Sequence, residues 1–176
     1  MQYKPYKKWK DNESGATAIE FSLVGVPFIL MVVGIIEMAL MFASHSLLEA
    51  ATAEAARQIR TGAVQQGGGE DLFRDTLCDY ASVFIQCDDL QYQVSAVDSF
   101  QDAQDFPEAE FDDEGNLQDQ QFESGGVSDV VLIRVVNSYF IKTPMMKLIL
   151  SNNESGKRIL ISTVVLQTEP YEFEDE

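Results

Sequence analysis

One segment constrains this chain more than any other: from Phe21 to Ile36, sixteen residues follow one another without a charged side chain. Small residues from Ala16 to Ile19 precede this run, and after Glu37 the apolar character continues to Ala43. A helix needs about 20 largely apolar residues to cross a hydrocarbon core. We therefore predict a membrane-spanning helix that begins near Ala16.

The flanks of this span predict its orientation. Four lysines lie between residues 4 and 10, and none follows the span closely. Because positive residues favour the cytoplasmic side, we expect the leader inside a bacterial cell and the rest outside the inner membrane. A cleaved secretory signal is the alternative, but the exit reads Met41-Phe42-Ala43, which fits an A-x-A cleavage site poorly. The pattern favours a retained anchor.

The helix is expected to continue beyond the membrane. Residues 44–60 contain no Gly or Pro, and apolar residues recur at helical spacing at Leu48, Ala51, Ala55 and Ile59. Gly62 is a typical residue after a helix end, and the glycine-rich segment 65–69 reads as a linker. The pattern predicts one long helix over residues 16–62.

Residues 63–176 predict a small head of the α+β class. A helix is expected at Glu70–Val83, with Leu72, Phe73, Leu77 and Tyr80 on its apolar face. Strand patterns occupy Leu90–Val97, Asp129–Tyr139 and Arg158–Gln167, with a short helix at residues 144–150. The acidic segment 99–126 is expected to be a loop. We predict an antiparallel sheet backed by one or two helices.

Charge is distributed unevenly and excludes one class of partner. Residues 1–62 carry six Lys/Arg and six Asp/Glu, so the net charge of −17 arises entirely from residues 63–176. A surface this acidic repels phosphate backbones, so we expect no nucleic-acid binding.

No enzymatic signature is present either. Nucleophile-elbow, P-loop, dinucleotide and zinc-protease motifs are missing, and the single histidine, His45, lies at the membrane exit. The sequence therefore predicts no catalytic residues, no cofactor and no metal site.

Cys78 and Cys87 are the two cysteines of the chain. They do not form a CxxC pair, and His45 is far from both in sequence, which argues against zinc. In an exported head a short-loop disulfide is expected. Two buried free thiols are the alternative.

Glu20 is unusual because it lies at the cytoplasmic edge of the apolar span, where a carboxylate is costly. If the chain is cut after Gly15, Ala16 acquires a cationic amine, and Glu20 lies one helical turn beyond it. The carboxylate can then pair with its own terminus or with that of a neighbouring subunit, which sets the register between helices. An interfacial glutamate that reaches the headgroups is the alternative.

The stretch GATAIEFSLVGVPFILMVVGIIEMALMFASHSLLEAATAEAARQIRTG, from Gly15 to Gly62, resembles the TadE-like pseudopilins of the tight-adherence (Tad or Flp) pilus system. The resemblance is carried by the start from Gly15 to Glu20-Phe21, by Pro27 and by Glu37 after Gly34-Ile35-Ile36. It continues more loosely through the head. The acidic insertion around Ser99–Gln121 departs from the family pattern, and the tail EFEDE is unusually acidic.

The resemblance implies a non-enzymatic minor pilin or pseudopilin. A prepilin peptidase is expected to cut between Gly15 and Ala16, and Glu20 and Phe21 then begin the assembly helix. Glu37 is expected to contact a helix of another pilus component; a carboxylate near the outer headgroups is the alternative reading.

The expected partners are the membrane, the peptidase, the other Tad pilins and pseudopilins, and the inner-membrane assembly platform. The role implied is surface adherence and biofilm formation, with the head in the periplasm or within the extracellular pilus. The implied division is a leader at 1–15, a membrane and stalk helix at 16–62 and a head at 63–176. A signal-anchored periplasmic binding or adhesion module that never enters a pilus is the alternative function.

Overall fold

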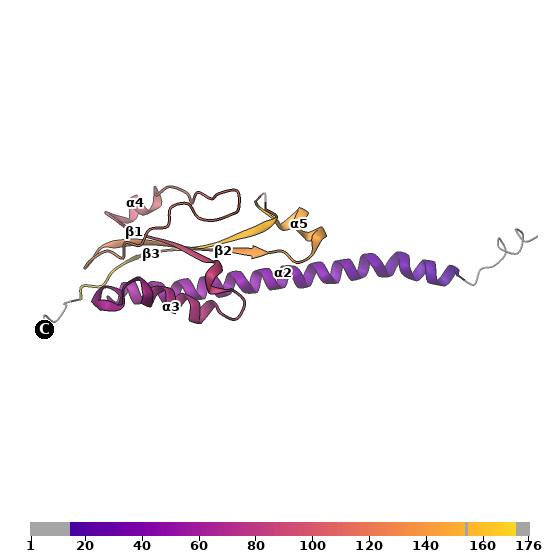
Figure 1. Ribbon diagram of the computed structural model, residues 1–176, viewed down its shortest axis with the longest axis horizontal. Coiled ribbons are helices and arrows are strands. Elements are labelled where there is room, and N and C mark those ends of the chain that lie inside the picture. Colours follow the sequence, from indigo (N-terminus) through magenta and orange to yellow (C-terminus); the bar gives the residue numbers. More distant parts are fainter. Residues whose placement is uncertain (1–14, 154, 172–176) are drawn as a thin grey trace, which may run out of the picture. The chain divides into compact units, whose positions relative to one another are not determined.

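The computed structural model describes residues 15–153 and 155–171 (Figure 1). The chain divides into two compact units between Ile36 and Glu37, and each is described separately. The elements in chain order are α2 (Ala16–Arg60), the π-helical turn η1 (Val64–Gly68), α3 (Gly69–Ala81), the 3-10 turn η2 (Cys87–Asp89), β1 (Leu90–Val97), α4 (Phe100–Gln104), β2 (Val130–Phe140), α5 (Pro144–Leu150) and β3 (Lys157–Gln167).

The first unit is the apolar part of α2. From residue 19 to residue 36 its large apolar side chains, such as Phe21 and Ile29, are exposed. α2 is long and apolar enough to cross a membrane by length and composition. Residues 16–36 extend about 32 Å at 1.5 Å per residue, which matches a hydrocarbon core of about 30 Å.

The second unit is built on a three-stranded antiparallel sheet with the order β1-β2-β3. Leu90 pairs with Asn137 and Val130 with Gln167, so β2 is the central strand. The fold is therefore α+β, as the strand patterns predicted, and each predicted strand lies within one residue of the observed bounds.

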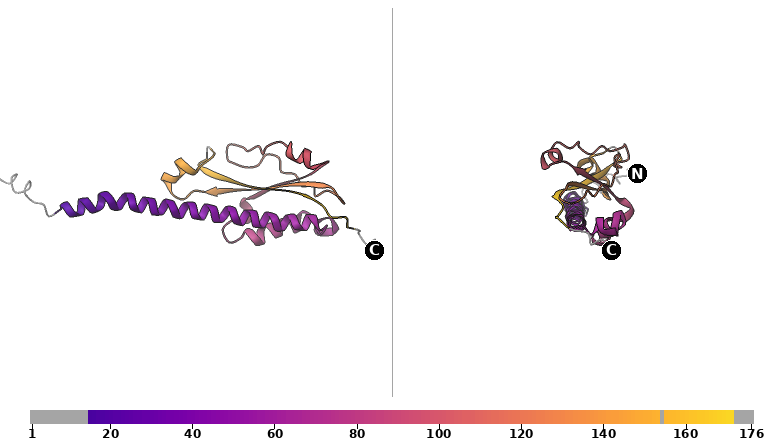
Figure 2. Two further views of the ribbon diagram at one scale, coloured as in Figure 1. Left: turned by 180° about the vertical axis from the view of Figure 1, so that it is seen from behind. Right: turned by 90° about the vertical axis from the view of Figure 1, so that its left-hand side faces the viewer.

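The core lies between one face of this sheet and two helices, the second half of α2 and α3. The end-on view of Figure 2 shows both helices on the same side of the sheet. The residues buried between them are Leu48, Ala51, Ala55 and Ile59 of α2, Phe73, Leu77 and Ala81 of α3, and Val94, Val131, Ile133, Val135 and Leu160 of the strands. All four members of the predicted α2 stripe are thus buried.

Two local expectations were wrong. The segment 99–126, expected to be a loop, contains the short helix α4 (Phe100–Gln104). Tyr80, placed on the apolar face of α3, is about half exposed, and Ala81 occupies the buried position instead. The glycine-rich segment 65–69, expected to be a linker, connects α2 to α3 and is kinked at Gly67, which has a φ of 132°. Glycine adopts such a φ at little cost, so the segment turns the chain from α2 into α3 within a few residues.

The acidic segment 99–126 covers the opposite face of the sheet (Figure 1). Arg134 of β2 holds it there: one guanidinium nitrogen donates to Gln93 Oε1 at 2.9 Å and another to the Pro107 carbonyl at 3.1 Å. The same guanidinium lies 5.9 Å from the centroid of the Phe106 ring. At the edge of β1, Val94 exchanges backbone hydrogen bonds with Gln121 and Glu123 at 2.8 Å. This segment is therefore an integral layer of the head.

Candidate functional site

The start of α2 holds the predicted processing site. Gly15 directly precedes the helix, and its carbonyl accepts a bond of 3.2 Å from the Ile19 amide. A Cβ atom placed on Gly15 would meet no described atom within 4 Å. Packing within the described part of the chain therefore gives no reason for a glycine at this position.

Glu20 and Phe21 both lie exposed on the first turns of α2. Phe21 is 78% exposed, and Glu20 forms no hydrogen bond or ion pair with any described residue. Both side chains are thus available to groups outside the described chain. The pairing of Glu20 with an amino terminus stays a prediction.

Glu37, the first residue of the second unit, is only 4% exposed. Its Oε1 accepts hydrogen bonds from Tyr139 Oη at 3.2 Å and from the Lys142 amide at 3.1 Å. Its Oε2 accepts from the amide and the hydroxyl of Thr143, at 3.2 and 2.8 Å. A buried carboxylate is tolerated only when it is well hydrogen-bonded, and these four donors meet that need.

The donors come from the end of β2 and the turn before α5, more than a hundred residues away in sequence. Burial, with the nearby charge of Glu37 adding to it, raises the pKa of Tyr139 to about 12. The phenol therefore stays a hydrogen-bond donor at neutral pH. Both oxygens of Glu37 are engaged within the chain, so the predicted contact with another pilus component would have to be made in addition to these bonds.

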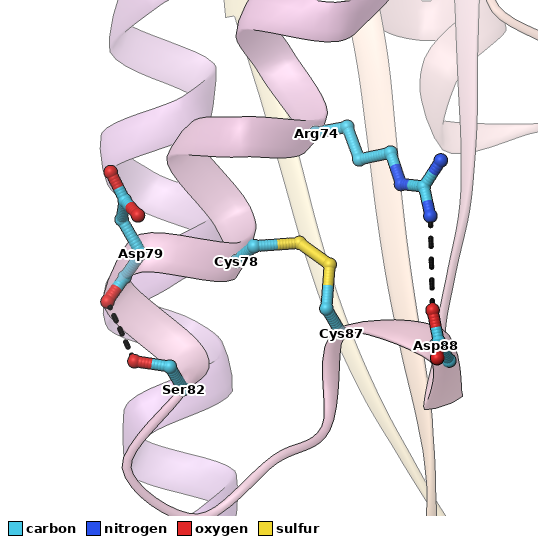
Figure 3. Close-up of a disulfide and its surroundings, with 6 residues drawn as sticks. All are labelled: Arg74, Cys78, Asp79, Ser82, Cys87 and Asp88. Atoms are coloured by element: carbon cyan, nitrogen blue, oxygen red, sulfur yellow. Dashed lines mark hydrogen bonds and ion pairs between the residues drawn. A yellow bond between two sulfur atoms is a disulfide. The ribbon is translucent and has the colours of Figure 1, made fainter.

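The predicted cysteine pair joins α3 to η2. Figure 3 shows the disulfide between Cys78 of α3 and Cys87 at the start of η2. Their Cα atoms are 5.2 Å apart, within the usual range for a disulfide. Nearby, Ser82 Oγ donates to the Asp79 carbonyl at 3.2 Å, and Arg74 lies 4.0 Å from Asp88. The bridge closes the turn that connects α3 to β1.

An open cavity of about 410 Å³ lies beside the disulfide, and four of its polar lining residues are paired with one another. Tyr92 Oη donates to Glu70 at 2.8 Å, and Arg74 pairs with Asp88. Burial and the bond to Glu70 raise the pKa of Tyr92 to about 12. Among the described residues no group of three or more His, Cys, Asp and Glu side chains could hold a metal ion.

Residues 15–57 match the family model described as TadE-like protein. We call residues 15–57 the TadE-like segment, after this match. Searches of curated proteins and of solved structures found no match. The TadE-like segment includes Gly15, Ala16, Glu20, Phe21 and Glu37, and it ends inside α2.

The head beyond the TadE-like segment contains the part of the site that sequence reasoning missed. Glu37 lies inside the matched segment. Its hydrogen-bond donors lie far outside the match, at Tyr139, Lys142 and Thr143. Pro144 at the first position is a typical helix start, and the helix predicted at residues 144–150 is observed as α5. No local signal pairs that turn with Glu37.

Proposed function

We propose that this chain is a minor pilin or pseudopilin of a Tad pilus, matured by a prepilin peptidase that cuts between Gly15 and Ala16. The match of residues 15–57 to TadE-like proteins carries this proposal. Two features of α2 support it. Gly15 has no packing reason to be glycine within the described chain, and the apolar side chains that follow it are exposed.

The proposed mechanism is helix packing. The exposed apolar side chains of residues 19–36 first face lipid and later face the helices of neighbouring subunits. Glu20 pairs with a free amine at Ala16, in the same or a neighbouring subunit, and this pair sets the axial register between helices. The chain is a structural component that aids surface adherence and biofilm formation, and it needs no catalytic residue.

The decisive experiment identifies the first residue of the mature protein by mass spectrometry. In cells that contain the prepilin peptidase, mass spectrometry of the membrane protein should find Ala16 first. Gly15→Leu should block cleavage and leave the protein inserted in the membrane. Gly25→Ala is the matched control, because a Cβ there makes only ordinary contacts, of 3.6 Å or more, with Phe21. An intact leader in such cells would favour a signal-anchored periplasmic module.

A second experiment separates cleavage from assembly. Glu20→Ala should be cut normally but should fail to support pili, because the register pair is lost. Glu49→Ala is the control, since Glu49 lies on the same helix and pairs with His45, at 3.6 Å. Normal piliation with Glu20→Ala would contradict the register role.

The proposed location of the head is outside the cytoplasm, and the Cys78–Cys87 pair supports it because disulfides persist in oxidising compartments. In freshly isolated membranes both cysteines should resist alkylation until a reductant is added. Free thiols in these membranes would contradict export of the head.

A further inference from the structure

The turn between β2 and β3 carries large apolar side chains that the described chain leaves uncovered. Leu148 is 89% exposed and Ile149 72%, and Phe140 and Met145 are more than half exposed. Together with Lys142 and Lys147 we call these residues the α5 corner. A helix of seven residues has little stability of its own in water. Exposed apolar clusters of this kind often mark surfaces that bind a protein, a membrane or a ligand.

The α5 corner is also the basic part of an acidic head. Residues 140–158 contain four cationic residues, Lys142, Lys147, Lys157 and Arg158, and one acidic residue, Glu154. The rest of residues 63–176 contains two cationic and 22 acidic residues. Lys147 lies 4.5 Å from the centroid of the Phe140 ring, and Arg158 donates to the Leu150 carbonyl at 3.3 Å. One of these cations therefore lies against an exposed aromatic ring of the corner.

Glu37 ties this corner to the chain position where the membrane anchor ends. The four hydrogen bonds to its carboxylate come from Tyr139, Lys142 and Thr143, which lie within or next to the corner. In sequence Glu37 follows directly after the exposed apolar run that ends at Ile36. The residue that holds the α5 corner is therefore the first one after this run.

We propose that the α5 corner docks on the anionic lipid surface of the membrane that anchors the chain. Leu148, Ile149 and Met145 enter the boundary between headgroups and acyl chains, and the lysines bind lipid phosphates, as in interfacial amphipathic segments. The proposal rests on the membrane anchoring in the proposed function. It adds a second contact with the bilayer, made by the head itself.

The charge pattern favours lipid as the occupant. An anionic headgroup layer attracts the α5 corner and repels the rest of the head, because 22 of the 23 acidic residues in 63–176 lie outside residues 140–158. The bilayer therefore orients the head with this corner toward it. If a second copy of the chain covered the α5 corner instead, burial of the corner would increase with the protein-to-lipid ratio.

The test uses the full chain reconstituted into vesicles, with one added cysteine. Cys78 and Cys87 are bonded to each other, so Leu148→Cys supplies the single reactive thiol for a polarity-sensitive fluorophore. Val127→Cys is the matched control. Val127 is 45% exposed and lies before the opposite end of β2, an 11-residue strand of roughly 35 Å. In vesicles with phosphatidylglycerol, lipid-borne nitroxides should quench the label at 148 and leave the label at 127 bright.

The charge dependence is tested in the same vesicles. Lys142→Gln and Lys147→Gln should each reduce the ratio of docked to undocked corner about fivefold, and together roughly 25-fold. Arg74→Gln, which removes an exposed cation beside Asp88, is the control and should change nothing. Replacing phosphatidylglycerol with phosphatidylcholine should reduce the ratio of docked to undocked corner as much as the double variant does.

Equal quenching at 148 and 127 would overturn the proposal, and so would quenching that ignores anionic lipid. Protection at 148 that rises with the protein-to-lipid ratio would assign the corner to a second copy. Flotation of the chain with the vesicles reports the anchor separately. A floating protein with an unquenched label therefore defeats only this inference, whereas an uncut N-terminus in cells defeats the proposed function.

Discussion

The two parts of α2 on either side of Glu37 differ in what surrounds them. Residues 16–36 carry bulky apolar side chains around the whole helix, and these are exposed. Residues 37–60 carry a narrow stripe, Leu48, Ala51, Ala55 and Ile59, that the sheet and α3 bury completely. A helix that is apolar all round suits lipid, whereas a stripe suits one packed face in water. Small residues in the stripe let the sheet approach closely.

The contrast shows how one helix can have one part suited to lipid and another part suited to packing in water, when its apolar pattern narrows from the whole circumference to one stripe. Glu37 marks the change, because it is the first buried carboxylate after the apolar run. The head depends on the second part of α2 for its core, so the two parts should respond differently to the same substitution.

The largest expected difference is between Leu48→Ala and Leu23→Ala. Leu48 is fully buried, so its truncation leaves a cavity and should lower the free energy of unfolding of the head by about 2–5 kcal/mol. Leu23 is exposed, so the same change should alter the stability of the head by less than about 0.5 kcal/mol. Proteolysis of the reconstituted protein across a urea series measures both. Equal losses would show that the head does not rest on the second part of α2.

Removal of the disulfide should have the next largest effect. The double variant Cys78→Ser, Cys87→Ser frees the turn that connects α3 to β1 and should cost the head about 2–4 kcal/mol. The same urea series checks this value against the oxidised wild-type protein, and the reduced wild-type protein should match the double variant. Insertion of residues 16–36 should be unchanged, and loss of flotation in this variant would show that the two parts are coupled.

Glu37→Ala tests the boundary itself. The change leaves the Tyr139 hydroxyl and the Lys142 and Thr143 amides without their acceptor, which should destabilise the head by about 1–3 kcal/mol. Glu49→Ala is the control, because its only described partner is His45 on the same helix. Hydrogen exchange at the Lys142 and Thr143 amides should rise in the first variant alone. Unchanged protection would mean that Glu37 does not hold this turn.

Local patterns were sufficient to predict α2, α3, α5 and the three strands, but not α4, which lies in the segment expected to be a loop. The stripe of α2, the three strands and the helix from Pro144 all follow from spacing and turn residues. Contacts between distant segments had no such signal. Neither the bonds between Glu37 and Thr143 nor the one between Arg134 and the Pro107 carbonyl can be read from either partner alone.

The candidate site divides in the same way. Gly15, Glu20 and Phe21 could be proposed from the sequence because the predicted processing site is a continuous motif. The α5 corner was missed although its apolar run and lysines were visible, because exposure is a property of the folded chain: Met145, Leu148 and Ile149 could equally have been core residues. Their exposure is seen only in the folded chain, where α5 lies between β2 and β3 in sequence.

The smallest expected effect concerns the glycine at the end of the packed part of α2. Gly62 follows the helix with φ 82°, and a Cβ there would lie 2.7 Å from the Tyr171 ring. Gly62→Ala should therefore destabilise the head by about 1–2 kcal/mol, from left-handed strain and from displacement of the ring. Gly25→Ala, in the exposed part, adds only ordinary contacts with Phe21 and should leave the stability of the head unchanged. Urea-dependent proteolysis of the two variants compares them directly, and equal values would show that the end of α2 tolerates a side chain that its geometry disfavours.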